Sequence, residues 1–443
     1  MDERQTGNAG GQPQGGSLIA ILGDLLDYTG EPSLDDPASP AVRLRADHWL
    51  LVDGGRIVAV QADPPGPSWR RIEHRGRLVM PGFVDTHVHS AQLDVIGSWG
   101  TQLIDWLHTH TFPAEQRMAD AGHAARTSAL FLDALLARGT TSACVFPTVH
   151  AVSVDALFAD ACARGMRLVA GKVLMDRHAP AALCDDVDGA ERECTALIER
   201  WHGRDRLAYA VTPRFAPTSS PAQLAMAGRL LARTPGLYLQ THVAENTQEV
   251  QWVRELFPQA RSYLDVYLRH GLVRERSVFA HGIWLDQEDR RVLHGQGAHI
   301  AFCPSSNLFL GSGLFDWPAA REAGVGVSLA SDVGGGTSLS MRRTLLDAYK
   351  VQAMAGRRIS AHALLHAATR GAAQALRLDG EIGSLEPGCV ADLAIWDWSS
   401  EPVGRRRQAV ARDLHERLFA WLTLGDESDL VETWVAGRRL WSR

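Results

Sequence analysis

The sequence lacks three features that would place the protein in a special class. It contains six cysteines, but no two of them have CxxC spacing, and their positions match no disulfide or metal-binding framework. It has no apolar run of 18 or more residues. It has no basic excess either, because 45 Lys and Arg face 51 Asp and Glu. We therefore expect a cytoplasmic protein with reduced thiols, no nucleic-acid partner and no membrane contact.

What is present is ordinary for a globular enzyme, with 45% hydrophobic and 22% charged residues. A chain of 443 residues exceeds the size at which one core usually stops growing, so we expect a large domain and a smaller one. Residues 1–16 are polar and rich in Gly and Gln, with no apolar stretch after the first charges. They predict a disordered tail and not a signal peptide.

The middle of the chain alternates between buried strands and helices. Eight apolar runs recur there, namely LVMPGFVDTH, TSACVFP, RLVAGKVLM, LAYAVTP, LYLQTHV, SVFAHG, AHIAFCP and VGVSLASD. Nearly every gap between them holds a helical stretch such as HAARTSALFLDALLARG. This alternation predicts an α/β fold, a (β/α)8 barrel of the TIM type, over residues 79–381.

The two ends of the chain differ from the middle. SLIAILGDLLDY and DHWLLVDGGRIVAVQ near the start, and GSLEPGCVADLAIWDW and DLVETWVAGRRLW near the end, have the pattern of short strands joined by turns. Asp53-Gly54-Gly55 is typical of a hairpin turn. Residues 17–78 and 382–443 are therefore predicted to pair into one small flanking β domain.

Two His-x-His motifs occur, His87 with His89 and His108 with His110. Chance alone gives roughly one such motif in a chain with 18 histidines, so spacing alone is weak evidence. Residues i and i+2 share one face of a strand but lie about 200° apart on a helix. The first pair ends a predicted strand, whereas the second lies in TQLIDWLHTHTF, which has helical spacing. We predict that the first pair chelates a metal and that the second packs or covers the substrate.

The predicted strands end in an unusual set of side chains. His87 and His89 end the first strand, His242 the fifth, His281 the sixth and Asp332 the eighth. A single histidine at a strand end more often fills the core. Because the C-terminal ends of barrel strands meet on one face, where barrel enzymes carry their active sites, this set predicts a metal site.

Three imidazoles and one carboxylate suit Zn²⁺ or Fe²⁺. The sequence offers no clear bridging ligand for a second ion, because Lys172 falls in the middle of the predicted third strand and is interpreted as structural. We therefore expect one metal per chain. It would lower the pKa of its water from about 15.7 towards about 7.

From about Leu18 to its end, the chain resembles the amidohydrolase superfamily in its mononuclear deaminase branch. The specific segments are PGFVDTHVHSAQ, DWLHTHTFPAEQR, GKVLMD, TPRFAPTSS, THVAENTQEV, AHGIWL, CPSSNLFLGSG and SDVGGGTSLSM. TFPAE and PRFAPT resemble the members of this branch that act on guanine. Two departures are mild: Ser331 stands where the family often has Thr, and three glycines follow Val333.

The resemblance implies a role for each matching residue. The implied ligands of one Zn²⁺, with Fe²⁺ as the alternative, are His87, His89, His242 and Asp332. The implied catalytic residues are Glu245, which shuttles protons, Asp332, and His281, which hydrogen-bonds the hydrolytic water. The implied contacts to a purine base are Gln92, Arg214, Phe215 and His281.

The expected reaction is hydrolytic deamination of guanine to xanthine and ammonia by zinc-activated water, in a homodimer by resemblance. One alternative is deamination or dechlorination of another ring, such as 8-oxoguanine, a triazine or cytosine, with the same metal site. Another is a metal-free scaffold that binds partners.

Considered alone, Glu245 could also be a carboxylate at the start of a helix, where the helix dipole favours a negative charge. Asn307 is interpreted as ordering its loop, and Cys303 as a small buried hydrophobe.

Overall fold

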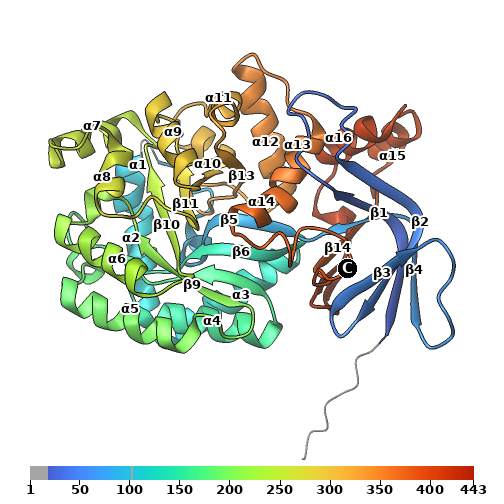
Figure 1. The fold of residues 1–443 in the computed structure, drawn as a ribbon, viewed down its shortest axis with the longest axis horizontal. Coiled ribbons are helices and arrows are strands. Elements are labelled where there is room, and N and C mark those ends of the chain that lie inside the picture. The colour runs from blue at the N-terminus through green and yellow to red at the C-terminus, as the bar shows by residue number, and fades with distance from the viewer. Residues whose placement is uncertain (1–17, 101–102) are drawn as a thin grey trace, which may run out of the picture.

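The computed structural model describes residues 18–100 and 103–443 and arranges them as a barrel beside a β sheet (Figure 1). The predicted tail at residues 1–16 lies outside the described residues. Within the described ranges, no helix is both long enough and apolar enough to cross a membrane.

The eight apolar runs form eight parallel barrel strands, which confirms the predicted α/β barrel. In sheet order these are β5 (Phe83–His89), β6 (Thr140–Phe146), β7 (Arg167–Ala170), β9 (Leu207–Pro213), β10 (Tyr238–Val243), β11 (Ser277–His281), β12 (His299–Phe302) and β13 (Gly326–Leu329). The short β8 (Val173–Leu174) also pairs with β9. Four of the eight barrel strands, β5, β6, β9 and β11, are buried along their whole length, because side chains fill the barrel inside and helices cover it outside.

The residues after β13 close the ring against β5. The Asp332 amide donates to the His87 carbonyl at 2.9 Å, and the His89 amide donates to the Val333 carbonyl at 2.8 Å. The first and last strands therefore place their C-terminal ends side by side.

The helices around the barrel have one apolar face each. In α5 (Val187–Trp201), for example, the buried residues are Ala190, Cys194, Leu197, Ile198 and Trp201, which recur at helical spacing. Asp186 begins this helix by accepting a hydrogen bond from the Gly189 amide at 2.7 Å. The other helices of the barrel region are α1 (Leu103–Trp106), α2 (Phe112–Gln116), α3 (Ala121–Leu136), α4 (Ala151–Arg164), α6 (Pro221–Arg233), α7 (Thr247–Leu256), α8 (Tyr263–Arg269), α9 (Gln287–Gly295), α10 (Pro304–Phe309), α11 (Trp317–Glu322), α12 (Met341–Met354), α13 (Ala361–Ala367) and α14 (Arg370–Ala375).

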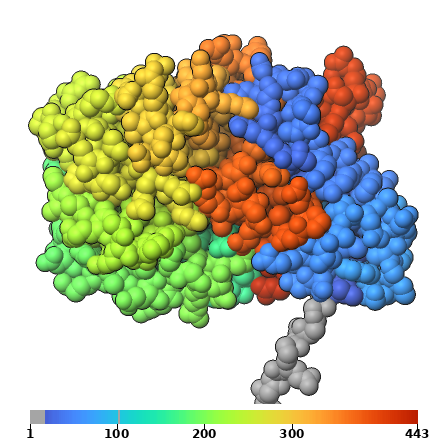
Figure 2. Space-filling model, in the orientation of Figure 1, coloured from blue at the N-terminus to red at the C-terminus, as the bar shows by residue number. Residues whose placement is uncertain are grey.

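Strands from both chain ends form one separate sheet, as predicted. Its order is β16 (Arg438–Ser442), β15 (Leu430–Val435), β14 (Leu393–Trp396), β4 (Arg70–Pro81), β1 (Ile19–Tyr28), β2 (Val42–Asp53) and β3 (Arg56–Gln61). The two ends meet where β14 pairs antiparallel with β4, placing Ile395 opposite Val79. Helices α15 (Pro402–Ala409) and α16 (Leu414–Leu424) come from the same C-terminal segment. The N- and C-terminal segments lie side by side on the surface, in blue and orange to red (Figure 2).

The first apolar run is divided between the two sheets, which the sequence analysis did not anticipate. Its first part, up to Pro81, ends β4 in the separate sheet, and β5 of the barrel begins only at Phe83. Gly82 lies between them so close to Thr141 that a Cβ atom there would be 2.3 Å from the threonine side chain. Only glycine fits this close approach of strand to strand.

Two buried histidines, His362 and His366, and the partly buried His415 lie where α13 and α16 pack near the end of β1. The Tyr28 ring is 5.8 Å from that of His366, and the rings of His362 and His415 are 5.5 Å apart. Burial, together with the nearby His415, lowers the pKa of His362 to about 4. Burial and the charge of Arg370 do the same for His366. Both imidazoles are therefore neutral in the folded protein near neutral pH.

This group should make the fold sensitive to acid. Between pH 6.5 and about 4 the unfolded chain binds protons that the folded imidazoles reject. The free energy of unfolding should therefore fall as the pH is lowered through this window, by at most about 1.4 kcal/mol per pH unit for each histidine. Denaturant titrations at pH 7, 6 and 5 measure this slope.

In His366→Gln, the free energy of unfolding should fall less steeply as the pH is lowered, by up to about 1.4 kcal/mol per pH unit, because one of the two titrating imidazoles is absent. His294→Gln, at an exposed position of α9, is the matched control and should keep the wild-type slope. Equal slopes in all three proteins would contradict the assignment.

Candidate active site

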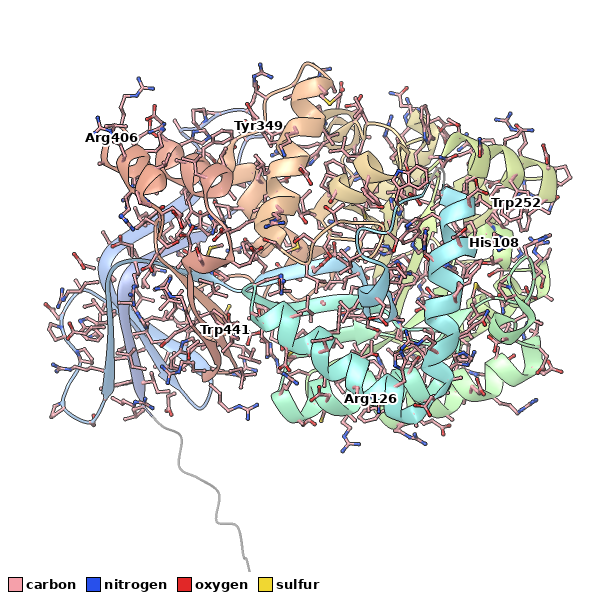
Figure 3. The ribbon with its side chains drawn as sticks, turned by 180° about the vertical axis from the view of Figure 1, so that it is seen from behind. His108, Arg126, Trp252, Tyr349, Arg406 and Trp441 are labelled. Atoms are coloured by element: carbon pink, nitrogen blue, oxygen red, sulfur yellow. The ribbon has the colours of Figure 1, made fainter. Side chains whose placement is uncertain are left out.

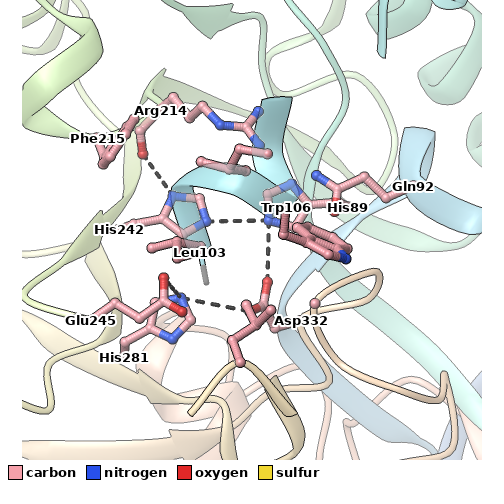
Figure 4. Close-up of a pocket in the computed structure, with 13 residues that line it drawn as sticks. His89, Gln92, Leu103, Trp106, Arg214, Phe215, His242, Glu245, His281 and Asp332 are labelled. Carbon is pink, nitrogen blue, oxygen red and sulfur yellow. Dashed lines mark hydrogen bonds and ion pairs between the residues drawn. The ribbon is translucent and has the colours of Figure 1, made fainter. Parts of the chain in front are cut away.

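Four polar side chains converge at the C-terminal edge of the barrel. His87 and His89 come from β5, His242 from β10, and Asp332 follows β13. Their candidate ligand atoms all lie within 4.8 Å of one another. Asp332 Oδ1 is 3.1 Å from His87 Nε2. It is also 3.2 Å from His89 Nε2, which lies 3.3 Å from His242 Nε2 (Figure 4).

A buried carboxylate next to this group holds the two strand ends in place. Asp85, two residues before His87 on β5, accepts hydrogen bonds from the Ser331 amide at 3.1 Å and the Ser331 hydroxyl at 2.5 Å. Ser331 immediately precedes Asp332. The contact between Asp85 and Ser331 therefore fixes the position of Asp332 relative to the two histidines of β5. The serine supplies the hydroxyl that the expected threonine would bring.

The donor set is ready to bind a cation. His242 Nδ1 donates to the Arg214 carbonyl at 2.7 Å, so its Nε2 presents a lone pair to the group. His87 Nε2 is buried and faces Asp332 Oδ1 at 3.1 Å, without a well-aligned hydrogen bond within the described ranges. Burial lowers the pKa of His89 to about 4, while the histidines outweigh burial and hold the pKa of Asp332 well below its usual value. Neutral imidazoles and an ionised carboxylate fit one divalent metal ion.

The neighbouring groups do not make a second, independent set of ligands in the described part of the chain. A second combination of neighbouring ligand atoms is His87, His281, Cys303 and Asp332, which shares two members with the first. Cys303 donates to the Ala301 carbonyl, and burial raises the pKa of its thiol. Lys172 is directed away, donating to Asp185 at 2.7 Å and to the Val149 carbonyl.

Glu245 lies in the turn between β10 and α7. In the structure, α7 begins at Thr247 with Asn246 as its N-cap, which is later than the sequence suggested. Glu245 therefore lies outside the first turn of this helix. The carboxylate that stabilises the helix start is Glu249, which accepts from the Glu245 amide at 2.9 Å. Glu245 is therefore free to face the metal group, where its Oε2 is 3.4 Å from His281 Nε2.

His281 and Glu245 are each held by a partner from the segment after β12. Asn307 Oδ1 accepts from His281 Nδ1 at 2.9 Å, so the other ring nitrogen of His281 faces Asp332 Oδ2 at 3.6 Å. The Ser312 hydroxyl donates to Glu245 Oε1 at 3.0 Å. Burial, reinforced by the charge of Asp332, raises the pKa of Glu245 to about 8. A carboxyl group in this range exchanges protons readily near neutral pH.

These groups share one cavity, whose empty space is about 410 Å³ when the part open to solvent is included. It is lined by His89, Gln92, Leu103, Trp106, Leu107, Arg214, Phe215, His242, Glu245, His281, Leu310, Asp332 and Gly335. Except for His87, which lies beneath, every residue that the sequence assigned to the site lines this cavity. The apolar part of its wall comes largely from α1 and the residue after it, namely Leu103, Trp106 and Leu107, to which the sequence analysis gave no role.

Two of the predicted substrate contacts, Gln92 and Arg214, are buried side by side and joined by a carboxylate that the sequence analysis did not assign. Glu115 accepts from Arg214 Nη1 at 2.8 Å through both of its oxygens, and from Gln92 Nε2 at 2.9 Å. Phe215 is buried beside Arg214. The only signal for Glu115 in the sequence is its place in the TFPAE segment.

The second His-x-His pair lies apart from the metal group. His108 is exposed and packs edge-on against Phe112 at 5.1 Å, and His110 Nε2 lies 3.0 Å from the Trp99 carbonyl. His108 and Trp252 line a separate, outer pocket on the side of the barrel seen in Figure 3. Neither histidine belongs to a group of neighbouring ligand atoms among the described residues.

Comparisons with known proteins agree over nearly the whole chain. The guanine deaminase of Escherichia coli strain K12 is 42% identical over 432 residues, which cover 96% of this chain and 98% of that protein. A probable guanine deaminase of Deinococcus radiodurans is 42% identical over 375 residues, covering 83% of this chain and 85% of that protein.

Solved structures match equally well. An E. coli guanine deaminase superposes with a TM-score of 0.92 at 42% identity, covering 96% of this chain and 100% of that one. A guanine deaminase from C. acetobutylicum with bound guanine in its active site gives 0.87 at 25% identity, with coverage of 96% and 100%. Residues 78–440 match the Amidohydrolase family, and they include every strand of the barrel. The chain belongs to the amidohydrolase family.

Proposed function

We propose that the protein catalyses hydrolytic deamination of guanine to xanthine and ammonia with one zinc ion per chain, Fe²⁺ being the alternative metal. The observation that carries this proposal is the buried Arg214–Gln92 wall facing the metal ligands across a single cavity. The relatives named guanine deaminase, which align along nearly the whole chain, support it.

The ion would be held by His87, His89, His242 and Asp332. When bound, it would make a water molecule acidic enough to act as a nucleophile near neutral pH. The short distance of 3.1 Å between His87 Nε2 and Asp332 Oδ1 and the hydrogen bond that fixes His242 support this assignment.

The protein residues then move the protons. Asp332 accepts a proton from the attacking water, and His281 Nε2 holds that water by a hydrogen bond. Glu245 donates a proton to N3 of guanine, so that C2 can become tetrahedral when the water oxygen bonds to it. Asp332 or Glu245 returns a proton to the amino group, which leaves as ammonia as the C2–N bond breaks, while the hydroxyl at C2 gives up its proton to the other carboxylate and becomes the carbonyl of xanthine.

Arg214 and Gln92 orient the base. The Arg214 guanidinium has only N–H donors, and those not used by Glu115 are available to the carbonyl O6 of guanine. Phe215 offers an apolar surface to the planar ring. Adenine carries an amine in place of O6, and it has no amine at C2, the carbon that faces the metal ligands.

The rival is the same reaction on another ring, because the metal group would be identical for 8-oxoguanine, a triazine or cytosine. Ammonia release from a panel of guanine, 8-oxoguanine, adenine, cytosine and triazines separates them. We expect guanine to have the highest kcat/KM and adenine to release no detectable ammonia. A triazine or cytosine turned over faster than guanine would overturn the proposal.

Arg214→Ala should sharply lower kcat/KM for guanine while the metal stays bound. A buried hydrogen-bond site can reject an unmatched ligand by about 10⁴–10⁵-fold, because its polar groups are left unpaired. The metal should stay because His242 is held by the backbone carbonyl of residue 214, which the variant retains.

Arg214→Lys is the graded control for this prediction. It should restore activity only in part, since a point charge cannot reproduce a planar fork of donors. Steady-state kinetics and elemental analysis of both variants test the assignment. Unchanged guanine turnover in Arg214→Ala would remove Arg214 from the purine contacts.

We also propose a homodimer located in the cytoplasm. The dimer is supported only by the resemblance to the superfamily, and the location by six cysteines that are free thiols in the structure. Light scattering of the purified protein tests the first, and cell fractionation tests the second.

A further inference from the structure

Glu115 is a fully buried carboxylate that contacts both polar residues of the substrate wall without lining the cavity itself. Its relative exposure is 0%, and it lies on α2, which is separated in sequence from both partners. Oε1 accepts from Gln92 Nε2 and from Arg214 Nη1, while Oε2 accepts from Arg214 Nη1. Such a position suits a residue that acts through its neighbours.

Glu115 leaves the Gln92 amide only one orientation. The amide oxygen accepts from the Gly334 backbone N–H at 3.0 Å, and the amide nitrogen donates to Glu115 at 2.9 Å. A flipped amide would place its NH₂ against that backbone N–H and its oxygen against the carboxylate. Both contacts would be repulsive, so the remaining N–H of Gln92 is a fixed donor towards a ligand.

Glu115 also sets how Arg214 presents itself. Nη1 of the planar guanidinium donates to both oxygens of Glu115, and the Phe112 ring lies 5.5 Å from the central carbon of the guanidinium. The carboxylate offsets the positive charge of Arg214, which sits beside a group of metal ligands. The remaining donors of Arg214 are thus held in one plane, and their charge is compensated without water.

We infer that Glu115 is a positioning residue that sets selectivity for a purine with a carbonyl at C6, by locking Gln92 and Arg214 as a fixed pair of donors. This inference rests on the proposed function, and it adds a residue that does not touch the substrate. In Glu115→Gln, one carboxylate oxygen becomes an NH₂ that meets the donors of Arg214 or Gln92. The Gln92 amide and the Arg214 guanidinium then lose their fixed orientations, and Arg214 loses the negative charge that offsets its own.

The test compares guanine with 2-aminopurine, which carries the same amine at C2 but has no O6 and no N1–H. In Glu115→Gln, kcat/KM for guanine should fall about 10–100-fold, mainly through KM, because buried donors lose their partner. The value for 2-aminopurine should change less than threefold. The guanine to 2-aminopurine ratio should therefore collapse, an outcome that a general loss of structure would not produce.

Two further variants keep the test decisive. Glu115→Asp keeps the charge but withdraws the carboxylate by one carbon, so the ratio should fall in the same direction but less. Asp94→Asn removes an exposed carboxylate that pairs with Arg117 at 2.9 Å, close to Gln92 in sequence, and should behave as wild type. Metal content and melting temperature identify any variant that fails to fold, in which case Glu115→Asp decides.

The possible failures are distinguishable. A wild-type protein that releases no ammonia from guanine would overturn the proposed function, and this inference with it. A wild-type ratio in folded Glu115→Gln and Glu115→Asp, in an enzyme that does deaminate guanine, would overturn this inference alone.

Discussion

Glu245→Gln should leave the metal bound and the fold intact but lower kcat for guanine by about 10²–10⁴-fold, the usual contribution of a positioned acid–base group. Glutamine is nearly the same shape and can still accept the Ser312 hydrogen bond, but it cannot carry a proton between water and N3. Burial and Asp332 raise the pKa of Glu245 to about 8, which suits a group that must both take and give a proton.

Steady-state kinetics together with elemental analysis separate lost chemistry from lost structure. Glu255→Gln, at an exposed position of α7, is the matched control and should retain wild-type kcat. If Glu245→Gln stays within threefold of wild type, Glu245 is a structural carboxylate and the proton route through it is wrong.

His242→Ala and Asp332→Ala should each lose the metal and, with it, all detectable turnover. Each removes one of four ligands and leaves a three-ligand site of distorted geometry. Asp332→Ala also removes the only carboxylate in the group, so no anionic ligand remains to offset the charge of the ion. Metal content after exhaustive dialysis, measured as moles per chain, should be close to one in wild type and near zero in both variants.

His108→Ala and His110→Ala are the controls, because these residues lie on a helical segment away from the ligand group. Both should keep the full metal content. Two ions per wild-type chain, or full occupancy in both ligand variants, would contradict a mononuclear site. Metal loss from His108→Ala would mean that the wrong pair of histidines was chosen.

Much of the fold could be predicted because its determinants are local. Strands buried on both faces produce continuous apolar runs, and helices between them have a 3.6-residue period, so the barrel is visible in the pattern alone. The strand-end residues could be assigned to one face because all parallel strands of a barrel end on the same side. That rule placed His242, His281 and Asp332 together although they are 39 or more residues apart along the chain.

The remaining features depend on contacts that no local pattern encodes. The division of the first apolar run between two sheets follows from how Gly82 packs against Thr141. Glu115 joins Gln92 and Arg214 only because α2 packs against the segment that follows β5, which sequence separations of 23 and 99 residues do not reveal. The sequence therefore left the Gln92 amide free to point either way, whereas the Gly334 amide and Glu115 hold it in one orientation.

The most direct test of the account is to supply guanine to the metal-loaded protein in water enriched in ¹⁸O and to analyse the product by mass spectrometry. The account predicts xanthine that carries one ¹⁸O atom at C2, formed together with one equivalent of ammonia. Absence of xanthine, or xanthine without the label, would contradict hydrolytic deamination of guanine at this site.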